Sequence, residues 1–245
     1  MATVAPRLET KAPRHTALVR VTHWLTVISF LALLVTGCEI LVSHPRFYWG
    51  EVGNDLTRPL FIIPIPASRD MVPTGYHVVL PDENGWSRYL HFEAAWVLVL
   101  TAFVYGLAGL FSGHFRRDLF PERGNRSLRA HWERLAKYLR RAPPDDAEAR
   151  SYNVLQRTAY VVVIFILFPM IIWTGLAMSP SFTSAFPATA SLLGGRQSAR
   201  TLHFFLTGLL VLFLVVHVTM IAMSGFRSRM RAMIAGRAAA PRERP

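Results

Sequence analysis

The sequence contains a single cysteine, Cys38, and no C-x-x-C-H motif. A single cysteine excludes an intramolecular disulfide, and the absence of the motif excludes a covalently attached c-type haem. Acidic residues are also scarce: 15 Asp and Glu stand against 27 Lys and Arg, which gives a formal net charge of +12. A nucleic-acid surface needs its basic residues on one folded face, whereas these flank apolar blocks, so we expect no nucleic-acid partner.

Long apolar blocks account for much of the 52% of residues that are hydrophobic. Four of them, residues 17–42, 89–111, 155–178 and 201–223, approach or reach the roughly 20 residues that cross about 30 Å of hydrocarbon. Each is predicted to be a helix, because backbone polar groups inside a membrane need internal partners. Pro169 is expected to kink the third helix. The first block is too long for a signal-peptide core and no A-x-A-like site follows it directly, so we expect it to be retained.

The predicted fold is therefore an all-α integral membrane protein, a bundle of four transmembrane helices. The bundle is expected to occupy residues 17–223, between a cytoplasmic N-terminal tail at 1–16 and a basic cytoplasmic tail at 224–245. Lys and Arg concentrate in both tails and in the inner loop at 112–154, so the positive-inside rule places these three regions, and both termini, in the cytoplasm.

Two segments that do not span the membrane are also distinctive. The outer loop at 43–88 is long, rich in Pro and Gly and supplied with aromatic residues, so it is expected to fold over the bundle or meet a partner. Within the inner loop, residues 125–141 carry apolar side chains at helical spacing among basic ones. This pattern is typical of a helix on an anionic leaflet, although a solvated connector fits it equally well.

Four histidines lie within the predicted spans, where an ionisable side chain is costly and usually faces the interior for a functional reason. His203 and His217 are fourteen residues apart, which returns the helix to nearly the same face after a rise of about 21 Å. The alternating direction of the helices then places His23 level with His217 near the cytoplasmic face, and His91 level with His203 near the outer face.

Two axial histidines per iron are what a low-spin electron-transfer haem requires. The two level pairs therefore predict two b-type haems held by coordination alone. A zinc site fits less well, because no cysteine or carboxylate lies at either level to complete the usual four ligands.

Two glycines are placed to leave room for a porphyrin. Gly37 follows His23 by fourteen residues, and Gly106 follows His91 by fifteen, so each helix offers a ligand at one depth and a gap at the other. Small residues are also ordinary helix-packing positions in membranes, which is the competing explanation.

Arg20, Arg88 and Arg200 each precede a predicted ligand by three residues, one turn nearer to water. A guanidinium there can pair with a haem propionate, or it can reach phospholipid headgroups. The remaining histidines are predicted not to bind iron: His15, His44, His77, His114 and His131.

Short motifs carry a resemblance to a known family: V-R-V-T-H-W at 19–24, H-P-R-F-Y-W-G at 44–50, Y-N-x-L-Q-R at 152–157 and R-T-L-H-F at 200–204. Over about residues 14–227 the chain resembles the bacterial cytochrome b561 and nickel-hydrogenase cytochrome b superfamily, and most of all its thiosulfate reductase-type branch. The resemblance implies a quinone-linked subunit of the bacterial cytoplasmic (inner) membrane, beside an extracytoplasmic molybdopterin oxidoreductase.

The resemblance also assigns individual residues. It implies that His23 and His217 bind the inner haem and that His91 and His203 bind the outer one. In formate dehydrogenase relatives menaquinone lies beside the inner haem, near an Asn at the start of the third helix, and Asn153 is the matching position. A helix cap is its alternative role.

The expected function is thus transfer of electrons between the membrane quinone pool and an extracytoplasmic partner. Two alternatives remain open: a stand-alone superoxide:quinone oxidoreductase, and a transporter or scaffold without haem whose histidines serve proton relay or packing. The direction of electron flow does not follow from the sequence, because it depends on the partner's redox couple.

Overall fold

The structure is a computed structural model that describes residues 15–54, 56–64, 83–120, 154–223 and 225–236, with isolated positions between 127 and 140. Among these residues, four helices are long and apolar enough to cross a membrane: Ala17–Ser43, Gly85–Phe111, Val154–Met178 and Arg196–Met223. They fit the predicted bundle of a multi-pass helical membrane protein.

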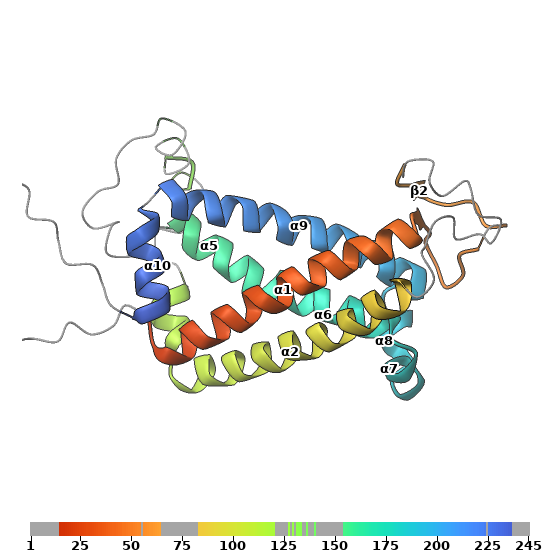
Figure 1. Cartoon of the computed structure of the whole chain (residues 1–245), viewed down its shortest axis with the longest axis horizontal. Coiled ribbons are helices and arrows are strands. Elements are labelled where there is room, and N and C mark those ends of the chain that lie inside the picture. The colour runs from red at the N-terminus through yellow and green to blue at the C-terminus, as the bar shows by residue number, and fades with distance from the viewer. Residues whose placement is uncertain are drawn as a thin grey trace, which may run out of the picture.

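The four spans lie side by side, and shorter elements gather at both ends of the bundle (Figure 1). The helices of the bundle are α1 (Ala17–Ser43), α2 (Glu83–Phe111), the consecutive segments α5 (Val154–Val162), η4 (Val163–Leu167) and α6 (Phe168–Met178), and α9 (Arg196–Met223). At one end lie η2 (Phe115–Leu119) and α10 (Phe226–Ala235), which crosses the bundle. At the other end lie the antiparallel pair β1 (Arg46–Phe47) and β2 (Phe61–Ile62), with α7 (Pro180–Ala185) and α8 (Ala188–Ser191).

The helices α1 and α2 pack against each other through small side chains. Buried residues recur at every seventh position on both helices: Thr22, Ser29, Thr36 and Ser43 on α1, and Ser87, Ala94 and Thr101 on α2. Seven-residue spacing keeps a seam on one face of a helix pair, and small side chains let two backbones approach closely in a membrane. Outside these buried positions α1 carries large apolar residues such as Ile28, which is 65% exposed and suited to lipid.

The second pair consists of α6 and α9, which pack against each other through Ala177 on Ala199 and through Ile171 on Leu210. The molecule is therefore built from two helical hairpins, α1 with α2 and α5–η4–α6 with α9. At mid-depth they meet where Phe30 of α1 packs against the cluster of Val163, Ile171 and Leu210. Above and below that contact, the space between the hairpins holds the histidines.

The third span is irregular before Pro169, which occupies the first turn of α6. Proline has no amide hydrogen and its ring collides with the carbonyl four residues earlier. The π-helical turn η4 widens the helix at this point. The kink predicted at Pro169 stays a prediction, and the structure has a π-helical turn directly before this residue.

Candidate functional site

Two pairs of histidines face each other between the hairpins. The ring centroids of His91 on α2 and His203 on α9 are 6.4 Å apart. Those of His23 on α1 and His217 on α9 are also 6.4 Å apart. An iron bound by two imidazole nitrogens at about 2.0 Å, each about 1.1 Å from its ring centroid, needs a separation of about 6.2 Å between the centroids. Both pairs therefore match the spacing of two axial ligands on one haem iron.

Threonine hydroxyls hold the two outer rings. Thr36 Oγ1 lies 2.9 Å from Nδ1 of His91, and Thr174 Oγ1 lies 2.9 Å from Nδ1 of His203. Both threonines are fully buried. Each hydrogen bond leaves the far ring nitrogen, Nε2, as the atom available to a metal.

A glycine follows each of these threonines and lies against the same ring. A Cβ added at Gly37 would stand 3.5 Å from Cε1 of His91, and one added at Gly175 would stand 3.6 Å from Cε1 of His203. In the structure the near neighbour of Gly37 is the His91 imidazole, and the expectation that Gly37 makes room for a porphyrin stays a prediction. The Thr-Gly dipeptides at 36–37 and 174–175 were the sequence signal for this arrangement, and sequence reasoning overlooked both threonines.

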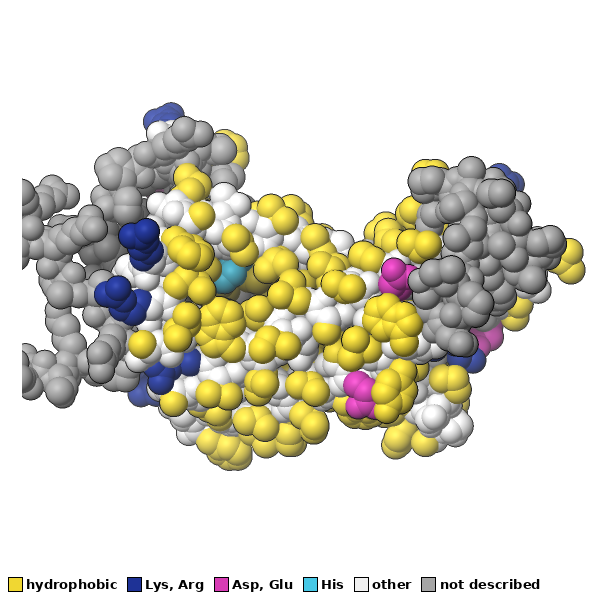
Figure 2. Space-filling view, in the orientation of Figure 1, with side chains coloured by type: hydrophobic (Ala, Val, Ile, Leu, Met, Phe, Trp, Pro, Cys, Tyr) yellow, Lys and Arg dark blue, Asp and Glu magenta, His cyan; other side chains and the backbone are white. Residues whose placement is uncertain are grey.

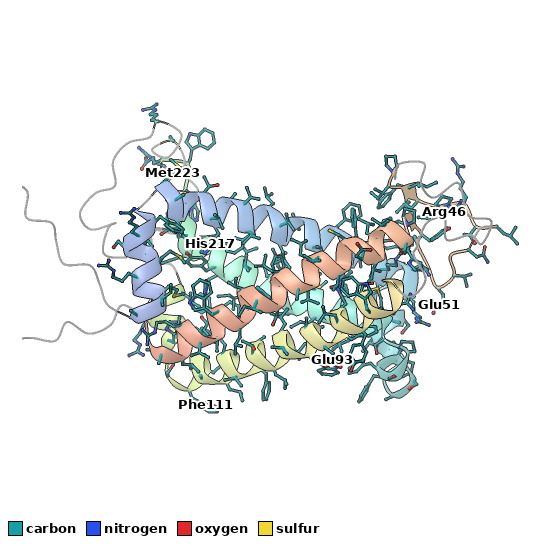
Figure 3. All side chains as sticks on the ribbon, in the orientation of Figure 1. Arg46, Glu51, Glu93, Phe111, His217 and Met223 are labelled. Carbon is teal, nitrogen blue, oxygen red and sulfur yellow. The ribbon has the colours of Figure 1, made fainter. Side chains whose placement is uncertain are left out.

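The inner pair is surrounded by aromatic rings instead. Trp24 stands edge-on to His23 at 5.4 Å, Phe213 stacks on His217 at 5.5 Å, and Tyr160 stands edge-on to His217 at 6.2 Å. Nδ1 of His23 is buried and has no hydrogen-bond partner within the described ranges. Figure 3 shows His217 in the half of the bundle near α10, and Figure 2 shows a histidine at the base of a hollow between α1 and α9 in that half.

The three arginines predicted to meet propionates differ in their surroundings. The guanidinium of Arg200 donates to the backbone carbonyls of His44 and of Arg46, the latter at 2.9 Å. Arg20 is half-buried near the start of α1, and Arg88 is exposed near the start of α2. Arg200 thus contacts the backbone that directly follows α1. Arg20 and Arg88 lie one turn from their histidines.

No described residue lies within 4 Å of a Cβ added at Gly106, and the same holds for Gly208 on α9. Both positions therefore leave open space among the residues that the structure describes. Asn153, the predicted quinone contact, lies outside the described residues, as does His77.

Further hydrogen bonds fasten the outer segment, residues 44–63, to the start of α9. Thr201 Oγ1 donates to the carbonyl of Tyr48 at 2.7 Å, and the amide of Gly50 donates to Ser198 Oγ at 2.8 Å. The ring of Phe47 stacks on Phe61 and also contacts Phe204, the residue that follows His203. The outer segment and the outer histidine pair consequently share one helix end.

The other histidines that the structure describes lie elsewhere. His44 ends α1, His114 lies 3.4 Å from the hydroxyl of Tyr105, and His131 contacts Thr158 Oγ1 at 2.9 Å. Among the described residues, no group of three or more His, Cys, Asp or Glu side chains converges as a metal site would require. Paired imidazoles without further protein ligands suit an iron whose remaining positions a porphyrin fills.

Comparison with known proteins agrees with this chemistry. A family model described as prokaryotic cytochrome b561 matches residues 14–236. A relative from Azospira oryzae, named "Putative protein-methionine-sulfoxide reductase subunit YedZ1", is 29% identical over 214 residues, which are 85% of this chain and 90% of the relative. No solved structure matches the chain. Cytochromes of the matched family bind haem b and carry electrons. Since the family model extends over nearly the whole sequence, the chain belongs to the prokaryotic cytochrome b561 family.

Proposed function

We propose that this protein holds two b haems and carries electrons between the membrane quinone pool and an oxidoreductase partner outside the cytoplasm. The observation that carries the proposal is the pair of 6.4 Å imidazole separations, one at each depth of the bundle. Each pair takes one ring from either hairpin, so one iron at each level would bind both halves of the bundle together.

The chain's own residues supply binding and orientation at each level. His91 and His203 hold the outer haem, and His23 and His217 hold the inner one. Haem b supplies reversible one-electron chemistry when bound. Arg20 and Arg88, one turn nearer to water than their histidines, are proposed to pair with propionates. The space beside Gly106 is proposed to admit the inner porphyrin.

The orientation in the membrane is inferred from charge. Basic side chains gather at the end of the molecule that carries α10 (Figure 2), where Arg227, Arg229 and Arg231 belong to that helix. The positive-inside rule assigns this end to the cytoplasm. We therefore propose that both termini are cytoplasmic, that the outer segment faces the opposite side, and that the membrane is the bacterial inner membrane.

The partner is proposed to dock on the outer segment. This segment is held to α9 by hydrogen bonds and still exposes large apolar side chains: Trp49 is 58% exposed and Leu56 is 96% exposed. The relative's name describes a reductase subunit, which supports a two-component complex here. By family resemblance the partner is a molybdopterin oxidoreductase, which would exchange electrons with the outer haem.

The quinone is proposed to react at the opposite end, near the inner haem and Asn153. A quinone carbonyl needs a hydrogen-bond donor, which the amide of Asn153 can supply. The family resemblance supports this location. The proposed docking surface for the partner lies beside the outer haem, which leaves the inner haem for the quinone.

The pairing of the four histidines provides the test. His91→Ala and His203→Ala should each remove the same haem, and His23→Ala and His217→Ala the other, as counted by pyridine haemochrome analysis and redox titration of the purified protein. His44→Ala is the matched control and should retain both haems. A folded wild-type protein with fewer than two haems, or a His23→Ala variant that loses the same haem as His91→Ala, would contradict the proposal.

A further inference from the structure

We propose that Thr36 and Thr174 are positioning residues that lower the midpoint potential of the outer haem and leave that of the inner haem unchanged. The inference rests on the proposed function, because it concerns the haem between His91 and His203. It goes further by assigning a role to two residues that touch the ligands and not the iron.

The direction of the hydrogen bonds follows from the other contacts of the threonines. Thr36 Oγ1 lies 2.7 Å from the carbonyl of Ala32, and Thr174 Oγ1 lies 2.9 Å from the carbonyl of Met170. A carbonyl can only accept, so each hydroxyl donates its one hydrogen to its own helix. Towards the histidine each hydroxyl oxygen therefore acts as an acceptor, and Nδ1 must carry the proton.

This arrangement fixes both the tautomer and the plane of each ring. With the proton on Nδ1, the lone pair of Nε2 is free for iron. The following glycine lies against the same ring at van der Waals distance, through Gly37 for His91 and Gly175 for His203. The Thr-Gly pair of α1 holds His91 of α2, and the Thr-Gly pair of α6 holds His203 of α9. Each outer ligand is therefore held by the other helix of its own hairpin.

The inner ligands have no equivalent support among the described residues. Nδ1 of His23 is buried and has no hydrogen-bond partner in the described part of the chain, and His217 lies against the aromatic rings of Tyr160 and Phe213. The threonine contacts are thus specific to one of the two sites.

An acceptor at Nδ1 makes the imidazole a stronger electron donor through Nε2. The ferric iron gains one electron on becoming ferrous and loses one positive charge, so a stronger donor ligand stabilises the ferric form more. Each threonine should consequently make the outer haem harder to reduce.

The experiment measures the midpoint potentials of both haems by spectroelectrochemical titration of the purified full-length protein. Thr36→Val and Thr174→Val keep the shape of the side chain and remove the hydroxyl acceptor. At a fixed potential each should raise the ferrous-to-ferric ratio of the outer haem roughly tenfold, equivalent to about 59 mV for one electron. Thr36→Ser restores the hydroxyl and should restore the potential.

Thr101→Val is the matched control, because Thr101 is buried in the same hairpin and donates to the carbonyl of Val97 at 2.7 Å. It should move neither potential. An unchanged outer potential in both valine variants, an equal shift of the inner haem, or a Thr36→Ser variant that behaves like Thr36→Val would each overturn the inference. If a valine variant loses the outer haem, the serine variant decides: recovery of that haem at its wild-type potential supports the role, and failure to recover it refutes the role. Wild-type protein without two haems would instead refute the proposed function.

Discussion

Gly37→Val should prevent binding of the proposed outer haem, whereas Gly37→Ala should leave it bound. An added Cβ at this position stands 3.5 Å from Cε1 and 4.0 Å from Nδ1 of His91, which is ordinary contact, so alanine fits. Valine places two further methyl groups about 1.5 Å beyond Cβ, and a helix leaves its χ1 little freedom to turn them away. The His91 ring would have to retreat by about 1 Å, whereas a metal–ligand distance tolerates about 0.2 Å.

The assay is haem content per polypeptide, with the redox titration identifying which haem remains. The alanine variant should keep the wild-type content, and the valine variant should fall to about half of it. Gly85→Val is a suitable control, because no described residue lies within 4 Å of an added Cβ there. Full haem content with unchanged spectra in Gly37→Val would show that the ring is not held against α1, and the reasoning would fail.

Three further predictions concern the two ends of the bundle. Asn153→Leu should slow haem reduction by quinol while leaving both haem spectra and reduction by dithionite intact; unchanged quinol kinetics would place the quinone elsewhere. Ser198→Ala removes the acceptor of the Gly50 amide, which should destabilise the attachment of the outer segment by about 1–3 kcal/mol, seen as faster amide hydrogen exchange there. Trp24→Phe removes the hydrogen bond from Nε1 to the carbonyl of Met233 in α10; hydrogen exchange in α10 should rise while both haems stay bound, and unchanged exchange would mean that this bond does not hold the helix.

The sequence by itself determined the membrane architecture. Long apolar blocks have few ways to satisfy their backbone in lipid, so their number and approximate positions follow from composition alone. The fourteen-residue interval between His203 and His217 places both on one helix face by the geometry of the helix. The alternation of helix direction then indicated which histidine on the other hairpin lies level with each, and the structure brings these same pairs together.

Contacts between distant segments were decided only by the tertiary structure. That Thr36 accepts from His91 depends on how closely α1 and α2 approach, and that Arg200 meets the carbonyls of the outer segment depends on how that segment folds back. The helix α10 lay within what the sequence indicated only as a basic tail. Spacing along one helix is set by local backbone geometry, whereas these contacts arise from packing between helices. Their distances, and hence their chemistry, depend on side chains far apart in the chain.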